Sequence, residues 1–177
     1  MIVVGIDPGV FGAIVALSEI NTMLHYKPFP YFRQTNSRCI SDGAALQLML
    51  AEFKETLDLT GQEIKTWLEM SIPMPRQASQ VTHQTGINWG LVKGILLASD
   101  WGFETLHPRV WSGHIHKGYK ADTAKIKSTM VLSQEYPEDY KQFVSGMFNK
   151  KETEGLIDAR LIATYGLMKA QKMKEGG

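Results

Sequence analysis

Apolar residues at the start of the chain follow the pattern of short buried strands. Residues 2–7 (IVVGID) form a nearly continuous apolar run that ends in an acid and is followed by a Pro-Gly turn. Residues 12–18 (GAIVALS) form a second run, and the short gap between the two favours an antiparallel hairpin. Residues 23–27 extend the pattern, so three adjacent strands are predicted to open the domain.

The apolar spacing changes to a helical period after residue 41. Ser41 or Asp42 can cap the start of this first helix, and Gly61 can end it. Its apolar residues recur three or four positions apart and share one helical face: Leu46, Met49, Leu50, Phe53 and Leu57.

Strands and helices alternate through the rest of the chain. The further predicted elements are strands at 64–70 and 103–106, a helical turn at 110–114, and helices at 78–101, 122–135 and 154–170. Residues 171–177 form a polar tail that we expect to be frayed. Hairpins followed by helical crossovers predict an α/β fold, with a mixed five-stranded sheet flanked by helices in a single domain spanning residues 1–177.

Three glycines lie on one side of the long helix predicted at 78–101. Gly86, Gly90 and Gly94 recur every four residues, which places them along one stripe. Because these positions lack side chains, a partner element or a nucleic-acid backbone can approach the helix closely there.

Composition narrows the class of protein. The chain has 177 residues, with 19 Lys and Arg against 18 Asp and Glu, for a formal charge of +1. Its one cysteine, Cys39, excludes an internal disulfide framework and fits a reducing compartment. We expect an intracellular protein that is not secreted, since no apolar run reaches the ~20 residues of a membrane span and no signal-peptide pattern is present. The balanced charge argues against a bulk coat of nucleic acid but leaves room for a local basic patch.

Acidic residues end apolar elements that are predicted to pack together. Asp7 ends the first strand and Glu69 the fourth, while Glu154 and Asp158 lie four residues apart on one face of the last helix. If the first and fourth strands are neighbours, the carboxylates meet at one rim of the sheet. Such hard oxygen ligands suit Mg²⁺ or Mn²⁺, and two of these ions about 4 Å apart support phosphodiester hydrolysis. The alternative is a set of solvated turn acids or, for Glu154, a charge at a helix N-terminus.

Four segments carry a resemblance to a known family: GIDPGVFGAIVAL, WLEM with the helix after it, the segment from His107 to Trp111, and EGLIDARLIATYG. They resemble the RuvC-type Holliday junction resolvases, particularly the phage-like branch, over most of the chain. The resemblance implies an RNase H-like fold and a homodimer. It also implies four carboxylates that use two Mg²⁺ ions, with Mn²⁺ as a substitute, to nick paired strands of a four-way DNA junction. The expected location is a bacterial or phage-infected cytoplasm, or a DNA-containing organelle.

The resemblance assigns three catalytic metal ligands by position: Asp7, which would bridge both ions, Glu69 and Asp158. The family pattern has a further acid three residues before the last aspartate, where this chain has Gly155. Glu154, one position earlier, is the fourth ligand that we expect, and Glu152 is the alternative.

A basic segment precedes the last helix and contains one acid, Asp122. Residues 117–120 (KGYK) have the composition of a flexible loop. Lys and Arg bind phosphates whatever the base sequence, so we expect this segment to contact DNA, with a solvated helix face as the alternative for its last two lysines. The basic residues are Arg109, Lys117, Lys120, Lys125 and Lys127.

Residues 71–77 (SIPMPRQ) directly follow Glu69 and are stiffened by two prolines. Related resolvases place a residue here that unstacks bases at the crossover, and the resemblance gives this role to Met74. Arg76 and Gln77 can bond phosphate or bases. Packing of an exposed linker is the alternative for Met74.

Other functions share parts of this pattern. GIDPGVFGAI also resembles the first phosphate loop of actin-like sugar kinases and chaperone ATPases, which need two such domains and more than about 300 residues. A related nuclease acting on other branched DNA or structured RNA uses the same acids, because these define the chemistry and not the substrate. A junction-binding protein without catalysis is the third alternative. If the four acids hold ions, the rest of the chain has a basic excess, so DNA binding should depend on metal as well as on salt.

Overall fold

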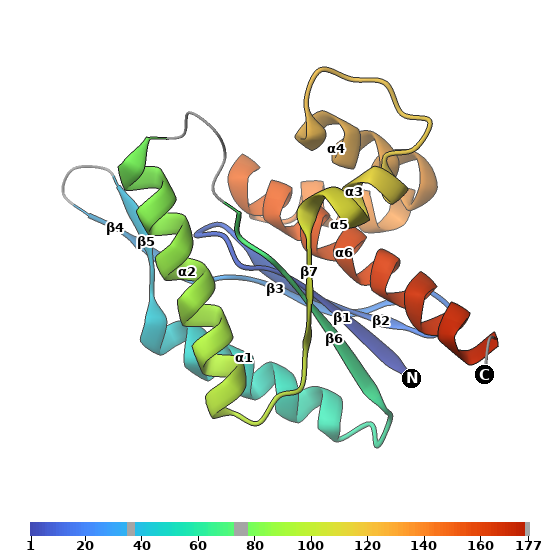
Figure 1. Ribbon diagram of the computed structural model, residues 1–177, viewed down its shortest axis with the longest axis horizontal. Helices are drawn as coiled ribbons and strands as arrows, with labels where there is room; N and C mark the ends of the chain where they lie inside the picture. The colour runs from blue at the N-terminus through green and yellow to red at the C-terminus, as the bar shows by residue number, and fades with distance from the viewer. Residues whose placement is uncertain (35–37, 73–77, 176–177) are drawn as a thin grey trace.

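A central sheet organises the computed structural model, which describes residues 1–34, 38–72 and 78–175 (Figure 1). The strand order is β3-β2-β1-β6-β7, with β1 antiparallel to β2 and parallel to β6. The predicted mixed five-stranded sheet is confirmed, and the first and fourth predicted strands are neighbours, which is the condition for their terminal acids to meet. The strands are β1 (Ile2–Asp7), β2 (Ala13–Ser18), β3 (Met23–Pro28), β6 (Ile64–Glu69) and β7 (Glu104–Leu106).

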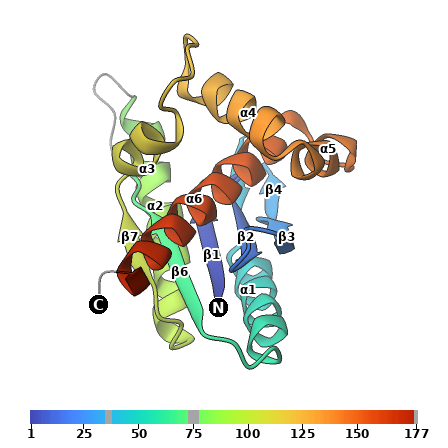
Figure 2. The same cartoon turned by 90° about the vertical axis from the view of Figure 1, so that its right-hand side faces the viewer.

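Helices cover both faces of the sheet. Figures 1 and 2 show α1 and α2 on one face and α6 running across the other, with α3, α4 and α5 beside it. Within the described ranges, no helix combines the length and apolar character needed to cross a membrane. The helices are α1 (Gly43–Asp58), α2 (Ser79–Ala98), α3 (Pro108–Ile115), α4 (Ala124–Glu135), α5 (Pro137–Ser145) and α6 (Lys150–Glu175).

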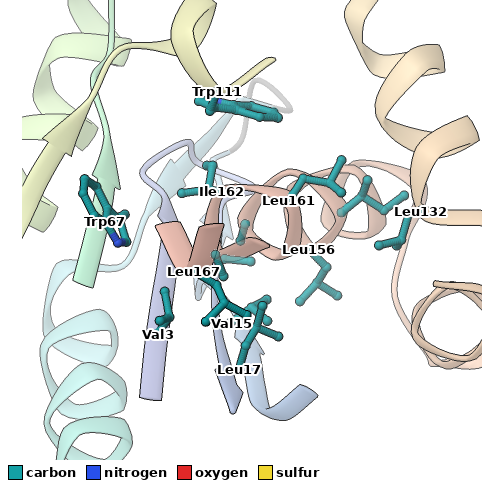
Figure 3. Close-up of a cluster of buried hydrophobic side chains, with 14 of the residues drawn as sticks. Val3, Val15, Leu17, Trp67, Trp111, Leu132, Leu156, Leu161, Ile162 and Leu167 are labelled. Atoms are coloured by element: carbon teal, nitrogen blue, oxygen red, sulfur yellow. The ribbon is translucent and has the colours of Figure 1, made fainter. Parts of the chain in front are cut away.

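Alternating residues of β1 supply two separate hydrophobic cores. Val3 points toward α6 and packs with Val15, Trp67 and Leu156, as Figure 3 shows. Ile2, Val4 and Ile6 belong to the opposite core, against α1 and α2. Because successive side chains of a strand point to opposite faces, a fully buried β1 needs apolar residues at every position, which explains its continuous apolar run.

Helix α6 lies unusually close to β1, and a glycine makes this possible. A Cβ atom on Gly5 would lie 2.3 Å from the Ala159 carbonyl oxygen and 2.4 Å from the Ala163 nitrogen, so only glycine fits between strand and helix. One turn further along, Gly166 leaves room for the Trp67 ring. This contact fixes the height and rotation of α6 above the sheet, and therefore the positions of the acids that it carries.

Several elements differ from the predictions. Helix α6 starts at Lys150 rather than at residue 154, because Asn149 Oδ1 accepts hydrogen bonds from the first backbone N–H groups. The prediction of a frayed tail is wrong for residues 171–175, which continue α6. Lys174 Nζ lies 2.7 Å from Glu19 Oε1 in the turn between β2 and β3. The predicted helical turn is the two-turn helix α3, and α5 fills a region without a predicted element.

A small hairpin was also missed. Strands β4 (Tyr31–Arg33) and β5 (Cys39–Ser41) form a separate two-stranded sheet between β3 and α1. Three-residue strands are too short to show a clear alternation of apolar and polar residues. The predicted Asp42 cap of α1 is confirmed, with Asp42 Oδ1 accepting from the Ala45 N–H at 3.0 Å.

Candidate acidic site

Two of the predicted acids lie side by side at the same edge of the sheet. Asp7 and Glu69 are the last residues of β1 and β6, which are paired in parallel register. Asp7 Oδ1 accepts a hydrogen bond from the Gly9 N–H at 3.0 Å. Glu69 Oε1 accepts one from Trp111 Nε1 at 2.7 Å. Each carboxylate is thus held by one donor, with further lone pairs left for other ligands.

The third acid, Asp158, reaches the same place from α6. Its carboxylate hydrogen-bonds the Ser128 hydroxyl of α4. The Ser128 oxygen lies 3.1 Å from His116 Nε2, so a donating Ser128 can accept in turn from a His116 that carries its proton on this nitrogen. This series of hydrogen bonds, from His116 through Ser128 to Asp158, orients the Asp158 carboxylate in the way that outer-sphere partners orient metal ligands.

The three carboxylates interact strongly and unfavourably with one another. Burial and the nearby Asp7 carboxylate raise the pKa of Glu69 to about 8. The same two causes raise the pKa of Asp158 to about 7, against the opposing effects of the Ser128 hydrogen bond and of Lys125. Burial raises the pKa of Asp7 as well, although the Gly9 N–H opposes it. A group of carboxyls that resists ionisation needs either protons or cations as partners.

Glu154 lies at the open side of this group and is paired with a lysine. Its Oε2 atom is 2.5 Å from Lys125 Nζ, and the Lys125 side chain is 62% exposed. Partial burial lowers the pKa of Lys125, but the nearby carboxylates, Glu154 foremost, together outweigh this effect and raise it. Asp7 and Asp158 add smaller contributions of the same sign, so this ammonium group partly neutralises the acids.

The structure explains why position 155 holds a glycine, where the resolvase pattern has an acid. A Cβ atom on Gly155 would lie 1.9 Å from the Phe11 carbonyl oxygen, so no side chain fits there. Glu152, the alternative fourth ligand, caps the start of α6 by accepting the Asn149 N–H at 2.7 Å. Glu154, in contrast, lines the same cleft as Asp7.

A cleft of about 700 Å³ opens from the acids toward α2. Gln80, Gln84 and Asn88 of α2 form its opposite wall. Its remaining lining comes from the end of β1 and the loop after it, from the β4–β5 hairpin, and from the starts of α4 and α6, and it includes three cations: Arg38, Lys125 and Lys151. An acidic end and a basic wall in one cleft suit a phosphodiester substrate once the acids are neutralised.

The other predicted DNA contacts are spread over α3, α4 and the loop between them. Lys117 and Lys120 are exposed on that loop. Arg109 lines a separate hollow of about 430 Å³ with Lys127 and His116. The three candidates between β6 and α2 lie outside the described residues: Met74, Arg76 and Gln77.

The chemistry of the carboxylate donors fits the implied magnesium site. Within residues 1–34, 38–72 and 78–175, no three acidic, His or Cys side chains already converge closely enough to hold an ion. The donors nevertheless fit Mg²⁺ or Mn²⁺, because they are carboxylate oxygens whose mutual repulsion a divalent cation would relieve. Asp7, Glu69 and Asp158 are the residues that could hold such an ion.

Residues that orient the acids were missed by sequence reasoning. Trp111 is buried, as expected for a core tryptophan, yet its indole N–H donates a hydrogen bond to the Glu69 carboxylate. Trp89 donates to the Glu69 carbonyl oxygen at 3.1 Å. Ser128 carries no sequence signal, because its role depends on the packing of α4 against α6. The sequence feature that pointed to Trp111 was the segment from His107 to Trp111, which resembles the resolvase family.

The metal-free protein is expected to lose thermal stability as the pH rises from 5 to 8. Because the pKa values of Glu69 and Asp158 are raised in the fold, the folded chain retains protons that the unfolded chain has already released in this range, so unfolding becomes easier with rising pH. Thermal unfolding in a chelating buffer should show a fall of about 3 °C or more, which corresponds to one pKa unit.

The control for this titration is the double variant Glu69→Gln with Asp158→Asn, which removes both groups while keeping their size. Its melting temperature should change much less between pH 5 and pH 8. A wild-type profile that is flat or rises over this interval would contradict the assignment of raised pKa values.

Comparisons with known proteins agree with the fold. No protein-family model and no curated protein matches this sequence. Among solved structures, the chain is similar to Thermus thermophilus RuvC in complex with a Holliday junction substrate, with a TM-score of 0.55, 16% identity, and coverage of 99% of this chain and 96% of the other. A second Thermus thermophilus RuvC structure matches with a TM-score of 0.54 and 14% identity, covering 96% of this chain and 97% of the other. The chain therefore has the RuvC-like, RNase H-like fold that its sequence predicts; its place in the phage-like branch stays a prediction.

Proposed function

We propose that this chain is a divalent-metal-dependent endonuclease that resolves four-way DNA junctions by paired symmetric nicks. The observation that carries the proposal is a group of buried, electrostatically interacting carboxylates, Asp7, Glu69 and Asp158. Asp7 lines a cleft that also contains basic side chains. The similarity to a RuvC structure solved with a Holliday junction substrate supports the choice of DNA junctions over other phosphodiesters.

In this proposal, the acids hold two Mg²⁺ ions, for which Mn²⁺ can substitute. Asp7 would contribute to both ion sites, Glu69 and Asp158 would each contribute to one, and Glu154 would complete the second site or orient water. When bound, the ions supply an activated water and stabilise the leaving oxygen. Since the carboxylates do not converge in the metal-free chain, ion binding would draw them together and free Lys125 from Glu154.

Neighbouring side chains prepare the acids for this task. Trp111 fixes Glu69 through a hydrogen bond of 2.7 Å, and Ser128 fixes Asp158 from the side of α4. Once released by Glu154, the Lys125 ammonium can bind the phosphate next to the reacting bond. Arg109, Lys117 and Lys120 extend the basic surface away from the acids and would bind the arms of the junction.

Paired nicks require two acidic sites, so we also propose a homodimer. Helix α2 offers a surface for it: Gly86, Gly90 and Gly94 have no heavy atom within 4 Å of where a Cβ would lie. Ile87 and Leu97 are exposed on the same helix, at 47% and 62%. A second α2 can approach this stripe closely and cover the two apolar side chains.

A nuclease acting on other branched DNA or on structured RNA is the second candidate. The acids are common to both candidates, and the cleft accepts any strand with a phosphate backbone. The two candidates differ in the nucleic acids that they cleave.

Asp7→Asn is expected to keep junction binding but to lose cleavage by more than about 100-fold, because even outer-sphere partners of a metal ligand contribute 10–100-fold. The assay compares a labelled four-way junction with linear duplex, a three-way branch and an RNA–DNA hybrid, each with and without Mg²⁺. The wild type should place symmetric nicks in the four-way junction alone.

Two further variants in the same assay distinguish the fourth ligand. Glu154→Gln should slow cleavage, whereas Glu152→Gln should leave it near the wild-type rate, since Glu152 caps α6 and does not line the cleft. Full cleavage by Asp7→Asn would refute the metal mechanism. Cleavage of the hybrid or of every branched DNA would favour the second candidate.

Ser128→Ala should weaken Mn²⁺ binding by about tenfold, measured by electron paramagnetic resonance of free Mn²⁺. The variant removes the hydrogen bond that favours the ionised Asp158. Ser133→Ala is the matched control on the same helix, because the Ser133 hydroxyl bonds only the Met130 carbonyl oxygen, at 3.0 Å. Equal affinities of wild type and Ser128→Ala would show that Ser128 does not position Asp158.

A further inference from the structure

The loop between β1 and β2 holds an aromatic ring beside the acids. Phe11 lies four residues after Asp7 and lines the same cleft, where it is only partly covered. Its backbone is fixed against α6, because the Phe11 carbonyl oxygen occupies the space that a Gly155 side chain would take. A Gly12 N–H to Gly9 carbonyl hydrogen bond of 2.9 Å closes the turn. The Phe11 ring therefore shares a cleft with Asp7 and Glu154, on a loop whose backbone is held against α6.

A second ring and a lysine complete a small wall around Phe11. The Tyr31 ring packs edge to face on Phe11, with centroids 4.8 Å apart and planes at 69°. Lys151 Nζ lies 4.9 Å from the centre of the Phe11 ring. Tyr31 is itself anchored, since its hydroxyl accepts a hydrogen bond from Asn149 Nδ2 at 2.9 Å. We call Phe11, Tyr31 and Lys151 the aromatic wall.

The hairpin that carries Tyr31 is tied to the far side of the cleft. Arg38 Nη2 donates to Gln84 Oε1 of α2 at 2.9 Å, and Gln84 Nε2 donates to Asn88 Oδ1 at 3.1 Å. The Ser41 hydroxyl of β5 also donates to Asn88 Oδ1, at 3.2 Å. These bonds tie the β4–β5 hairpin to α2 across the cleft. Phe11 and Lys151 of the aromatic wall line that cleft directly.

We propose that the aromatic wall is a nucleotide subsite, which holds the nucleotide next to the cleaved phosphate in an unstacked conformation. Lys151 would bind the neighbouring phosphate, and Phe11 would contact the base or sugar. Aromatic rings beside cations are the usual means of binding unstacked nucleotides without reading their sequence. The inference rests on the proposed nuclease function and adds a reason for preferring branched DNA, since bases unstack more easily at a crossover than in a duplex.

Junction binding in Ca²⁺, which holds the complex without cleavage, tests the wall. Lys151→Ala should weaken binding five- to tenfold and lower the salt slope by about one, as expected for one lost phosphate contact. Lys150→Ala removes the same charge from the adjacent residue, which does not line the cleft, and should change binding less than twofold. Phe11→Leu should weaken binding about tenfold, and Phe32→Leu, on the same hairpin as Tyr31, is its control.

A fluorescent base gives a readout that folding defects do not imitate. With 2-aminopurine next to the nicked position, wild type and Phe32→Leu should change its emission on binding, and Phe11→Leu should not. Equal effects of Lys150→Ala and Lys151→Ala, or a change of emission in Phe11→Leu as large as that in the wild type, would overturn the subsite while leaving the nuclease proposal intact. Failure of the wild type to bind any nucleic acid would overturn both.

Discussion

The close packing of α6 on β1 determines where the acids meet. Gly5 lets the backbone of α6 approach at Ala159 and Ala163, closer than any side chain would permit. Because Asp158 directly precedes Ala159, the same contact brings its carboxylate over the end of β1, where Asp7 lies. A second close contact, at Gly155, fixes the loop that follows Asp7. Two glycine contacts thus connect the hydrophobic core to the geometry of the candidate site.

This packing brings buried carboxylates close together, which affects the pKa values and the ion pair of the site. Burial and mutual repulsion raise the pKa values of Glu69 and Asp158, so the metal-free fold keeps protons on groups that are normally ionised. Lys125 supplies a compensating positive charge through its pair with Glu154. A divalent ion would replace the protons and release the lysine toward the substrate. The formal charge of +1 therefore conceals a division between an acidic centre and basic surroundings.

The sequence predicted the fold where local pattern and packing agree. The apolar runs of β1 and β2 and the helical period of α1 each identify an element. From the sequence, the pairing of β1 with β6 was only a condition for the acids to meet, and the structure supplies it. The β4–β5 hairpin was missed because three-residue strands have no readable period. The roles of Trp111 and Ser128 depend on contacts between distant elements, which no local pattern encodes. Phe11 and Lys151 join one wall only because Gly155 lets their segments touch.

Calorimetric titration of Mn²⁺ into the metal-free protein at pH 7 tests the acidic site most directly. In two buffers with different ionisation enthalpies, the heats should show about two ions bound per chain and a net release of protons, since Glu69 and Asp158 are partly protonated before binding. Glu69→Gln should reduce both the affinity and the proton release. Absence of binding at millimolar Mn²⁺, or binding with no proton release, would contradict the proposal that buried acids exchange protons for divalent ions.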